Sequence, residues 1–260
     1  IMKEKIDSAV QTEQFQILLS RFSHELRNPL ALLSSELQLL ASSHPELTYD
    51  EQWENIYANL DYIHALLNDM TRYQNAGQLS LVLTDLSACL NEIAKSFRPT
   101  LDYLGIEFET DIPNDLPNLS LDPLKIRQVF LNILRNAQEA IDHPHGTIHF
   151  RAESSAQYVH ISISDNGCGM TSSQKKRVFE PFITYKSGGT GLGLAVTRQI
   201  IEAHHGSIEI ESAPGSGSTF HIYFPLTRLD GCQARTAITN PAIIPPTCLL
   251  YTSDAADELD

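Results

Sequence analysis

The feature that most limits how this chain can fold is a pair of long apolar seams near its N-terminus. In residues 3–42, apolar side chains recur at steps of three and four, at Phe15, Leu19, Phe22, Leu26, Pro29, Leu33, Leu37 and Leu40. The same spacing continues in a second stretch, at Trp53, Ile56, Leu60, Ile63, Leu67 and Met70. This spacing predicts two amphipathic helices, which the short polar connection over residues 42–50 joins as a helical hairpin. Because a lone hairpin cannot bury both seams, we expect two copies to pair as a dimeric four-helix bundle.

The composition indicates a folded protein rather than a membrane or nucleic-acid-binding one. The 260 residues leave room for two modest domains, and 42% of them are hydrophobic and 19% charged. A net charge of -14 disfavours binding to nucleic acid, which needs a basic surface. The acidity serves solubility, or it complements a basic surface on a partner.

Two further features bear on the cellular location. The four cysteines have no C-x-x-C spacing, which favours free thiols in a reducing compartment over disulfides or a zinc site. No run approaches the roughly 20 apolar residues that a membrane span needs, and there is no signal peptide. We therefore expect this fragment to be cytoplasmic without membrane contact, with any membrane anchor lying upstream.

A histidine with a neighbouring carboxylate stands out in the first predicted helix. His24 lies two residues past Phe22, off the apolar seam, and should face solvent beside Glu25. Pro29 cannot donate a hydrogen bond to the carbonyl of Glu25, so it should bend or loosen the helix there. Both features suit an imidazole that a separate domain must reach. A surface histidine beside a tolerated kink is the alternative, and this segment alone leaves both open.

After Gly77 the pattern changes to mixed helix and strand. Helices are predicted over residues 86–104, 122–141 and 191–205, and alternating strands over residues 106–110, 147–152, 158–163, 207–211 and 219–224. Asp122 is the expected N-cap of the second helix, with Pro123 at its first position. Together these elements predict an α+β sandwich, a sheet with helices on one face.

The C-terminal segment, residues 227–260, lacks periodicity and is rich in proline, so we expect a disordered tail. Residues 248–258 resemble a translated sequencing adapter. We interpret them as an assembly artefact and infer no function from them.

The helix over residues 122–141 carries polar groups on one face. Asn132, Asn136 and Glu139 follow at steps of four and three and therefore share that face. Amide and carboxylate oxygens are hard ligands that suit Mg²⁺, which keeps several waters and bridges to phosphates. A solvated polar face is the alternative.

Two glycine-containing segments follow. Asp165 ends a predicted strand just before Gly167 and Gly169, where a carboxylate can accept a hydrogen bond from an exocyclic amine. An ordinary turn has the same composition. Downstream, glycines at 188, 189, 191 and 193 open a helix, whose free N–H groups can bind phosphate oxygens.

Taken in order, these segments resemble the conserved boxes of sensor histidine kinases in two-component signalling. The sequence reads H-E-L-R-N-P-L from His24, N-x-x-x-N-A from Asn132, D-N-G-C-G from Asp165, F-E-P-F from Phe179, G-T-G-L-G-L from Gly189 and G-S-G-S-T-F from Gly215. The match spans residues 15–225. Residues 181–194 are most similar to the short-lid kinases related to nitrogen regulators and sporulation kinases.

This resemblance implies two domains and a reaction. Residues 1–77 would be the dimerisation and histidine-phosphotransfer domain, and residues 78–226 the catalytic ATP-binding domain of the Bergerat (GHKL) fold. His24 would attack the γ-phosphate of ATP, with Glu25 as acid/base partner and Arg27 stabilising charge. The phosphoryl group would pass to an aspartate of a response regulator, and Asn28 would orient water for dephosphorylating that regulator.

The resemblance also assigns the nucleotide site. Asn136 is expected to bind Mg²⁺, with Asn132 as a weaker ligand, and Asp165 to bind the adenine amine. The other residues expected at the ATP site are Gly167, Gly169, Phe179, Phe182, Lys186, Gly189, Thr190, Gly191, Leu192, Gly193 and Thr219. Two alternatives remain: an ATPase of the same superfamily that forms no phosphohistidine, and a dimeric scaffold without catalysis.

Overall fold

The computed structural model describes residues 23, 25–186 and 188–226. All of them belong to the first of two compact units, Ile1–Thr227 and Arg228–Asp260. His24 and the predicted tail, including the adapter-like residues 248–258, lie outside the described residues.

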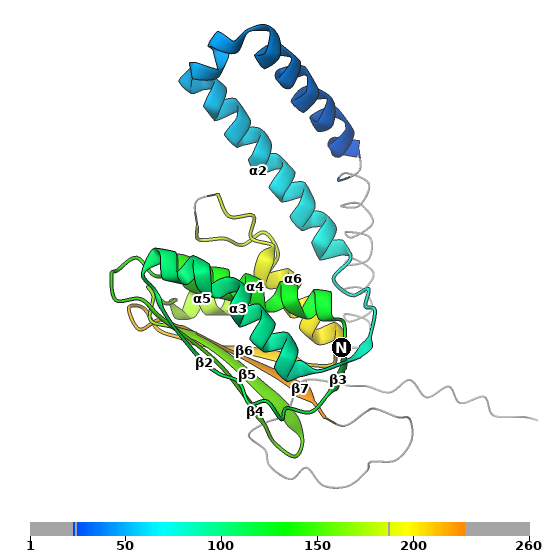
Figure 1. Ribbon diagram of the computed structural model, residues 1–260, viewed down its shortest axis with the longest axis vertical. Helices are drawn as coiled ribbons and strands as arrows, with labels where there is room; N and C mark the ends of the chain where they lie inside the picture. The colour runs from blue at the N-terminus through cyan, green and yellow to red at the C-terminus, as the bar shows by residue number, and fades with distance from the viewer. Residues whose placement is uncertain (1–22, 24, 187, 227–260) are drawn as a thin grey trace, which may run out of the picture. The chain divides into compact units, whose positions relative to one another are not determined.

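The N-terminal part is a helical hairpin, as the sequence predicts. Residues 25–43 are helical, a short 3-10 helix η1 (Pro45–Tyr49) makes the connection, and α2 (Glu51–Gln74) returns alongside (Figure 1). Asp50 caps α2, accepting a hydrogen bond from the Gln52 amide at 2.8 Å.

The hairpin buries only a narrow part of its apolar surface. Leu30, Leu60 and Leu67 form a small core of their own. Leu60 and Leu67 belong to the predicted seams, but three seam residues of the first helix are exposed: Leu26 at 47%, Leu33 at 49% and Leu40 at 41%. The first helix therefore has a second apolar face that its own hairpin does not cover.

The C-terminal part is built on a five-stranded mixed sheet of order β2-β4-β5-β7-β6. Its strands are β2 (Glu107–Asp111), β4 (Thr147–Ser154), β5 (Tyr158–Asp165), β6 (Ser207–Ser212) and β7 (Ser218–Pro225). Only β2 and β4 are parallel, and the other neighbours pair antiparallel.

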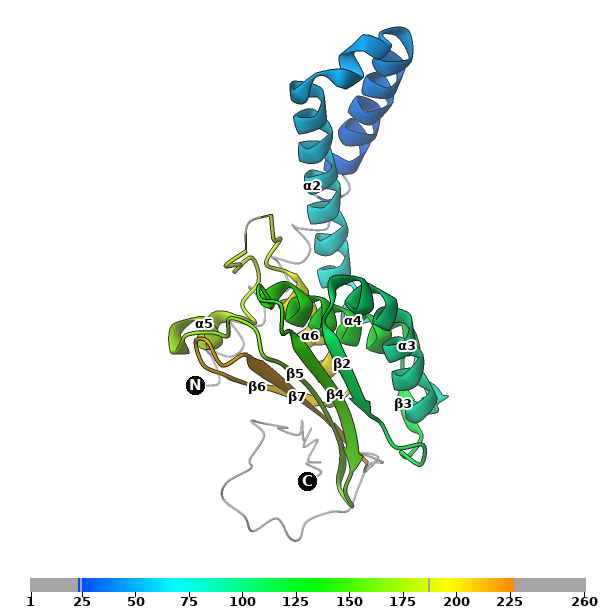
Figure 2. The ribbon, with the colours of Figure 1, turned by 60° about the vertical axis from the view of Figure 1, so that its left-hand side comes forward.

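Three helices cover one face of this sheet (Figure 2). They are α3 (Leu86–Leu104), α4 (Pro123–Ala140) and α6 (Gly193–Ala203). Alternate residues of β5 and β7 face them and are buried, among them Ile161, Ile163 and Phe220, and the core continues into Phe130 and Ile133 of α4. The predicted α+β sandwich is therefore confirmed.

Besides η1, three short elements were not predicted. β1 (Val82–Thr84) and β3 (Leu119–Leu121) form a separate two-stranded sheet. α5 (Ser172–Arg177) begins with a capping box between Thr171 and Gln174. Among the helices that the structure describes, none has the length and apolarity to cross a bilayer.

A buried polar contact fixes the start of α4 against α6. Asp122 is the N-cap, as predicted, and its carboxylate accepts from the amides of Leu124 and Lys125. Its own amide donates to Nε2 of the buried His204 at 2.9 Å. This contact joins the two helices that carry opposite sides of the site described next.

Candidate functional site

A pocket of about 600 Å³ lies over α4, the ends of β5 and β7, and the segment that leads into α6. Most of the residues predicted at a nucleotide site line it: Asn132, Asn136, Glu139, Asp165, Gly169, Lys186, Gly189, Thr190, Gly191 and Gly193. These residues come from separate segments of the chain, between Asn132 and Gly193, and meet only in the folded chain.

Asp165 forms one end of the pocket. Its Oδ1 accepts hydrogen bonds from the amides of Gly167 at 2.9 Å and Ser218 at 3.2 Å. Burial raises the pKa of this carboxyl, although these two amides and the charge of Lys186 oppose the rise. The carboxylate is thus held in one orientation, with Oδ2 left for a ligand.

Gly167 allows the close packing on which this orientation depends. A Cβ at this position would overlap the carbonyl of Ala140 at the end of α4. Gly167 therefore serves the shape of the site without lining the pocket.

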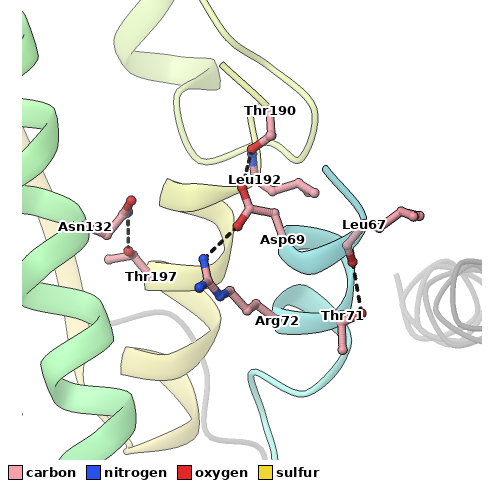
Figure 3. A network of polar contacts seen from close by, with 8 residues as sticks. All are labelled: Leu67, Asp69, Thr71, Arg72, Asn132, Thr190, Leu192 and Thr197. Atoms are coloured by element: carbon pink, nitrogen blue, oxygen red, sulfur yellow. Dashed lines mark hydrogen bonds and ion pairs between the residues drawn. The ribbon is translucent and has the colours of Figure 1, made fainter. Parts of the chain in front are cut away.

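Asn132 and Asn136 occupy the predicted face of α4 but make different contacts. The Asn132 amide donates to Thr197 Oγ1 of α6 at 2.9 Å (Figure 3). Asn136 Oδ1 instead accepts from the Lys186 ammonium group at 3.0 Å, and Glu139 Oε2 lies 2.6 Å from the same nitrogen. Asn132 thus joins two helices, whereas Asn136 and Glu139 already hold a cation.

The segment entering α6 follows a tight path. Gly191 has a φ of 69°, and an added Cβ would lie 2.6 Å from the carbonyl carbon of Phe182. The Phe182 amide donates to the Gly191 carbonyl at 3.0 Å. Leu192 is fully buried, and the first turn of α6 reaches the pocket through Gly193. The N-terminal end of a helix therefore faces the pocket, a favourable place for an anion.

The two predicted phenylalanine anchors are placed differently. Phe179 packs against the core, with the guanidinium of Arg198 5.9 Å from its ring centroid. Phe182 is 40% exposed. Neither phenylalanine lines the pocket.

Thr219 does not fit its predicted place in the nucleotide site. It lies on the open face of the sheet, where its hydroxyl meets that of Ser164 at 2.9 Å. Its neighbour Ser218 faces the pocket and bonds to Asp165. Strand alternation explains the difference, because a shift of one residue moves a side chain to the opposite face. Asp165 pairs with Ser218 across the two strands. The sequence would have indicated Ser218 only if this strand register had been known.

Two family models match the chain. Residues 16–78 match the "His Kinase A (phospho-acceptor) domain", and residues 121–228 match the "Histidine kinase-, DNA gyrase B-, and HSP90-like ATPase". The solved catalytic domain of histidine kinase ThkA is 31% identical, with 96% of that chain and 56% of this one covered, at a TM-score of 0.51. The chain belongs to the sensor histidine kinases.

Other histidine kinases are similar over both parts of the chain. AtoS of Escherichia coli K12 is 32% identical, and sporulation kinase E of Bacillus subtilis 168 is 34% identical, each over 80% of this chain. The alignments cover 34% and 28% of those two proteins, so the chain spans about a third of the length of each.

Two larger solved structures are similar over more of this chain than the ThkA catalytic domain is. Full-length ShkA in complex with AMPPNP is 26% identical over 80% of this chain and 45% of that one, at a TM-score of 0.65. ThkA in complex with response regulator protein TrrA is 25% identical over 80% and 60%, at a TM-score of 0.57.

The histidine-box residues of this family member lie on the hairpin, and those described do not line the pocket. Glu25 and Asn28 are exposed, and Arg27 donates to Thr71 Oγ1 of α2 at 2.9 Å. The end of α2 itself does reach the pocket, because Thr190 donates to Asp69 Oδ2 at 2.7 Å (Figure 3). Sequence reasoning did not single out Asp69, which carries no motif.

Proposed function

We propose that this chain is an ATP-dependent protein-histidine kinase that phosphorylates itself and passes the phosphoryl group to an aspartate of a response regulator. The observation that carries the proposal is the single pocket uniting Asp165, Asn136 and the N-terminal end of α6. Membership of the histidine kinase family and the AMPPNP complex of the related ShkA support it.

Asp165 would select the base of the nucleotide. Its carboxylate is fixed by two backbone amides and lines the pocket, where Oδ2 can accept from an exocyclic amine. Adenine offers such a donor at the position where guanine has a carbonyl oxygen. ATP is therefore the triphosphate that this end of the pocket favours.

Asn136 would be the principal Mg²⁺ ligand, with Asn132 as a weaker one. The position of Lys186 supports this assignment, since its ammonium group lies against oxygens of Asn136 and Glu139. No group of three or more metal-binding side chains occurs in the described part of the chain. Water and phosphate oxygens would complete the shell, and Mg²⁺ there would neutralise phosphate charge.

The glycine turn and Lys186 would bind the phosphates. Gly189, Gly191 and Gly193 line the pocket. The positive N-terminal end of the α6 dipole would also attract the phosphates. Ser218, rather than Thr219, would shape the base-binding end, because it lines the pocket and its amide donates to Asp165.

His24 would be the acceptor. A ring nitrogen of His24 would form the new bond to the γ-phosphorus while the bond to the ADP oxygen breaks. Glu25 would hold the proton on the other ring nitrogen, and Arg27 would stabilise the transferred charge. Asn28 would orient the water that hydrolyses the aspartyl phosphate of the response regulator, which is the proposed phosphatase activity.

The domain limits, dimer and partner are proposed on the same basis. Residues 1–77 would form a homodimer through the exposed leucines of the first helix, and residues 78–226 would bind ATP. The response-regulator complex of ThkA supports a receiver domain as the partner. This part of the protein would lie in the cytoplasm.

One experiment tests the function against both alternatives. Incubation with γ-labelled ATP and Mg²⁺ should give an acid-labile, alkali-stable label that His24→Gln abolishes. ATP hydrolysis without a label would indicate a conformational ATPase, and absence of nucleotide binding would indicate a scaffold.

A further inference from the structure

On the face of the sheet opposite α3, α4 and α6, two histidines lie on neighbouring strands. Alternate residues of β5 and β7 point to this face, among them His160, Ser162, His221 and Tyr223. In the register of the two strands, His160 lies opposite Tyr223 and Ser162 lies opposite His221. The two imidazoles are therefore diagonal neighbours.

Their ring nitrogens are in contact. Nε2 of His160 lies 3.0 Å from Nδ1 of His221, and the ring planes are inclined by 22°. The Tyr223 ring stacks on His160 with centroids 4.7 Å apart. The histidine side chains are only 17% and 19% exposed. Packing thus holds both rings close to one arrangement.

Carboxylates lie at the outer ends of the pair. His160 Nδ1 is 2.8 Å from Glu153 Oε1, so this carboxylate can hold the proton on Nδ1 and leave a lone pair on Nε2. His221 Nε2 is buried without a hydrogen-bond partner, 3.9 Å from Glu211 Oε2. A carboxylate behind a histidine is the usual arrangement that orients a metal-binding imidazole.

We propose that His160 and His221 form a binding site for a first-row divalent transition-metal ion such as Ni²⁺, Cu²⁺ or Zn²⁺. With metal–nitrogen bonds of about 2.0–2.1 Å, two nitrogens 3.0 Å apart subtend about 90° at the ion. That angle suits neighbouring positions of an octahedral or square-planar shell, and imidazole is a preferred ligand of these ions. A modest rotation of each ring would aim both lone pairs at the ion, once the proton on His221 Nδ1 has moved to Nε2 on the side of Glu211. The ion then takes the place of the hydrogen bond between the rings.

Water would complete the coordination shell. Within the residues described, no three or more histidine, cysteine, aspartate or glutamate side chains are grouped to hold a metal. The site therefore has two protein ligands and should bind reversibly. Glu209 lies opposite His221 on β6, and Glu153 and Glu211 are close by, so the surrounding charge favours a cation. This site is separate from the pocket, which lies on the helix-covered side of the sheet.

Calorimetric titration of NiCl2 into the full chain tests the proposal. Thiols are first blocked with iodoacetamide, and nucleotide and Mg²⁺ are left out. His160→Asn and His221→Asn should each weaken the tightest Ni²⁺ site at least about ten-fold, or remove it. His149→Asn is the matched control: His149 is on the same face, 2.8 Å from Glu109, and makes no contact with another imidazole in the described structure. Its Ni²⁺ affinity should equal that of the unmodified chain.

A second measurement locates the ion and guards against misfolded variants. Substoichiometric Cu²⁺ should broaden the amide NMR signals of residues 158–164 and 219–225 first, and His160→Asn should abolish this selectivity while leaving the other signals in place. Unchanged Ni²⁺ affinity in both variants, an equal loss in His149→Asn, or broadening that begins elsewhere would overturn the proposal.

Discussion

The Lys186 ammonium nitrogen lies 3.0 Å from Oδ1 of Asn136, on the face of α4 that the sequence predicts to bind Mg²⁺. The same nitrogen lies 2.6 Å from Glu139 Oε2. A positive charge therefore already occupies the place where a divalent ion would meet α4. When nucleotide and metal bind, the ammonium group would leave these oxygens and become available to a phosphate.

Asn136→Ala should separate metal-dependent from metal-independent nucleotide binding. Because the variant lacks the amide oxygen, its affinity for ATP with Mg²⁺ should fall about ten-fold or more, and ADP binding without Mg²⁺ should change little. Calorimetry with and without Mg²⁺ measures both. Gln138→Ala is the control on the same helix, because Gln138 does not line the pocket. An equal loss with and without Mg²⁺ would contradict the metal-binding role of Asn136.

Gly191→Ala should weaken nucleotide binding by distorting the turn before α6. The change combines a φ of 69° with a Cβ 2.6 Å from the Phe182 backbone. We expect AMPPNP affinity to fall about ten-fold or more.

Gly188→Ala is the matched control for this substitution. Gly188 also has a positive φ, 74°, but an added Cβ would have no neighbour within 4 Å. It should cost only the backbone strain, about 1–2 kcal/mol at most, in a turn open to solvent. Equal affinities of the two variants would show that the contact with Phe182 does not shape the site.

The sequence predicted elements best where local signals mark both ends. The helix predicted over residues 86–104 is found as α3, which begins after the N-cap Asp85 and ends at Gly105 with a φ of 69°. β1 and β3 have three residues each, too few for periodicity, and are defined only by pairing with each other. Their existence depends on contacts between distant segments that no local pattern reports.

In the candidate site, too, local patterns were predictable and contacts between distant segments were not. Asn132 and Asn136 were predictable from spacing as residues of one helix face. Their different partners, Thr197 and Lys186, were not. The sequence predicts Thr219 at the site, whereas Ser218 lines the pocket, because strand register decides which of two neighbours faces it. Asp69 reaches Thr190 only through the packing of the chain and has no signal of its own.

Because His204 is buried, we expect the folded chain to lose stability at mildly acidic pH. Burial lowers the pKa of this imidazole, which is neutral when it accepts from the Asp122 amide. As pH falls from 7.5 to 5.5, the unfolded chain gains a proton here that the folded chain resists, so the free energy of unfolding decreases. The slope from this group should approach about 1.4 kcal/mol per pH unit below its unfolded pKa.

Urea unfolding at several pH values measures this effect. His204→Gln should be less stable at pH 7.5 but show a smaller decrease toward pH 5.5, whereas the exposed His145→Gln should keep the slope of the unmodified chain. The carboxyl group of Asp122 does not titrate in this pH range and so does not affect the comparison. Burial acts to raise the pKa of its carboxyl, but backbone hydrogen bonds outweigh burial and lower it, so it titrates below this window. Equal slopes for His204→Gln and the unmodified chain would refute the role of His204.

The exposed face of the first helix predicts dimerisation through leucines. Leu33 and Leu40 are 49% and 41% exposed at a heptad spacing, and their burial against a second hairpin would contribute about 1.5–3 kcal/mol for each fully buried side chain. The double variant Leu33→Ser/Leu40→Ser should shift the chain toward monomer in sedimentation equilibrium. Leu83→Ser, on the 71% exposed Leu83 of β1, should leave the dimer intact. If the double variant stayed as dimeric as the unmodified chain, the pairing face would have to lie elsewhere.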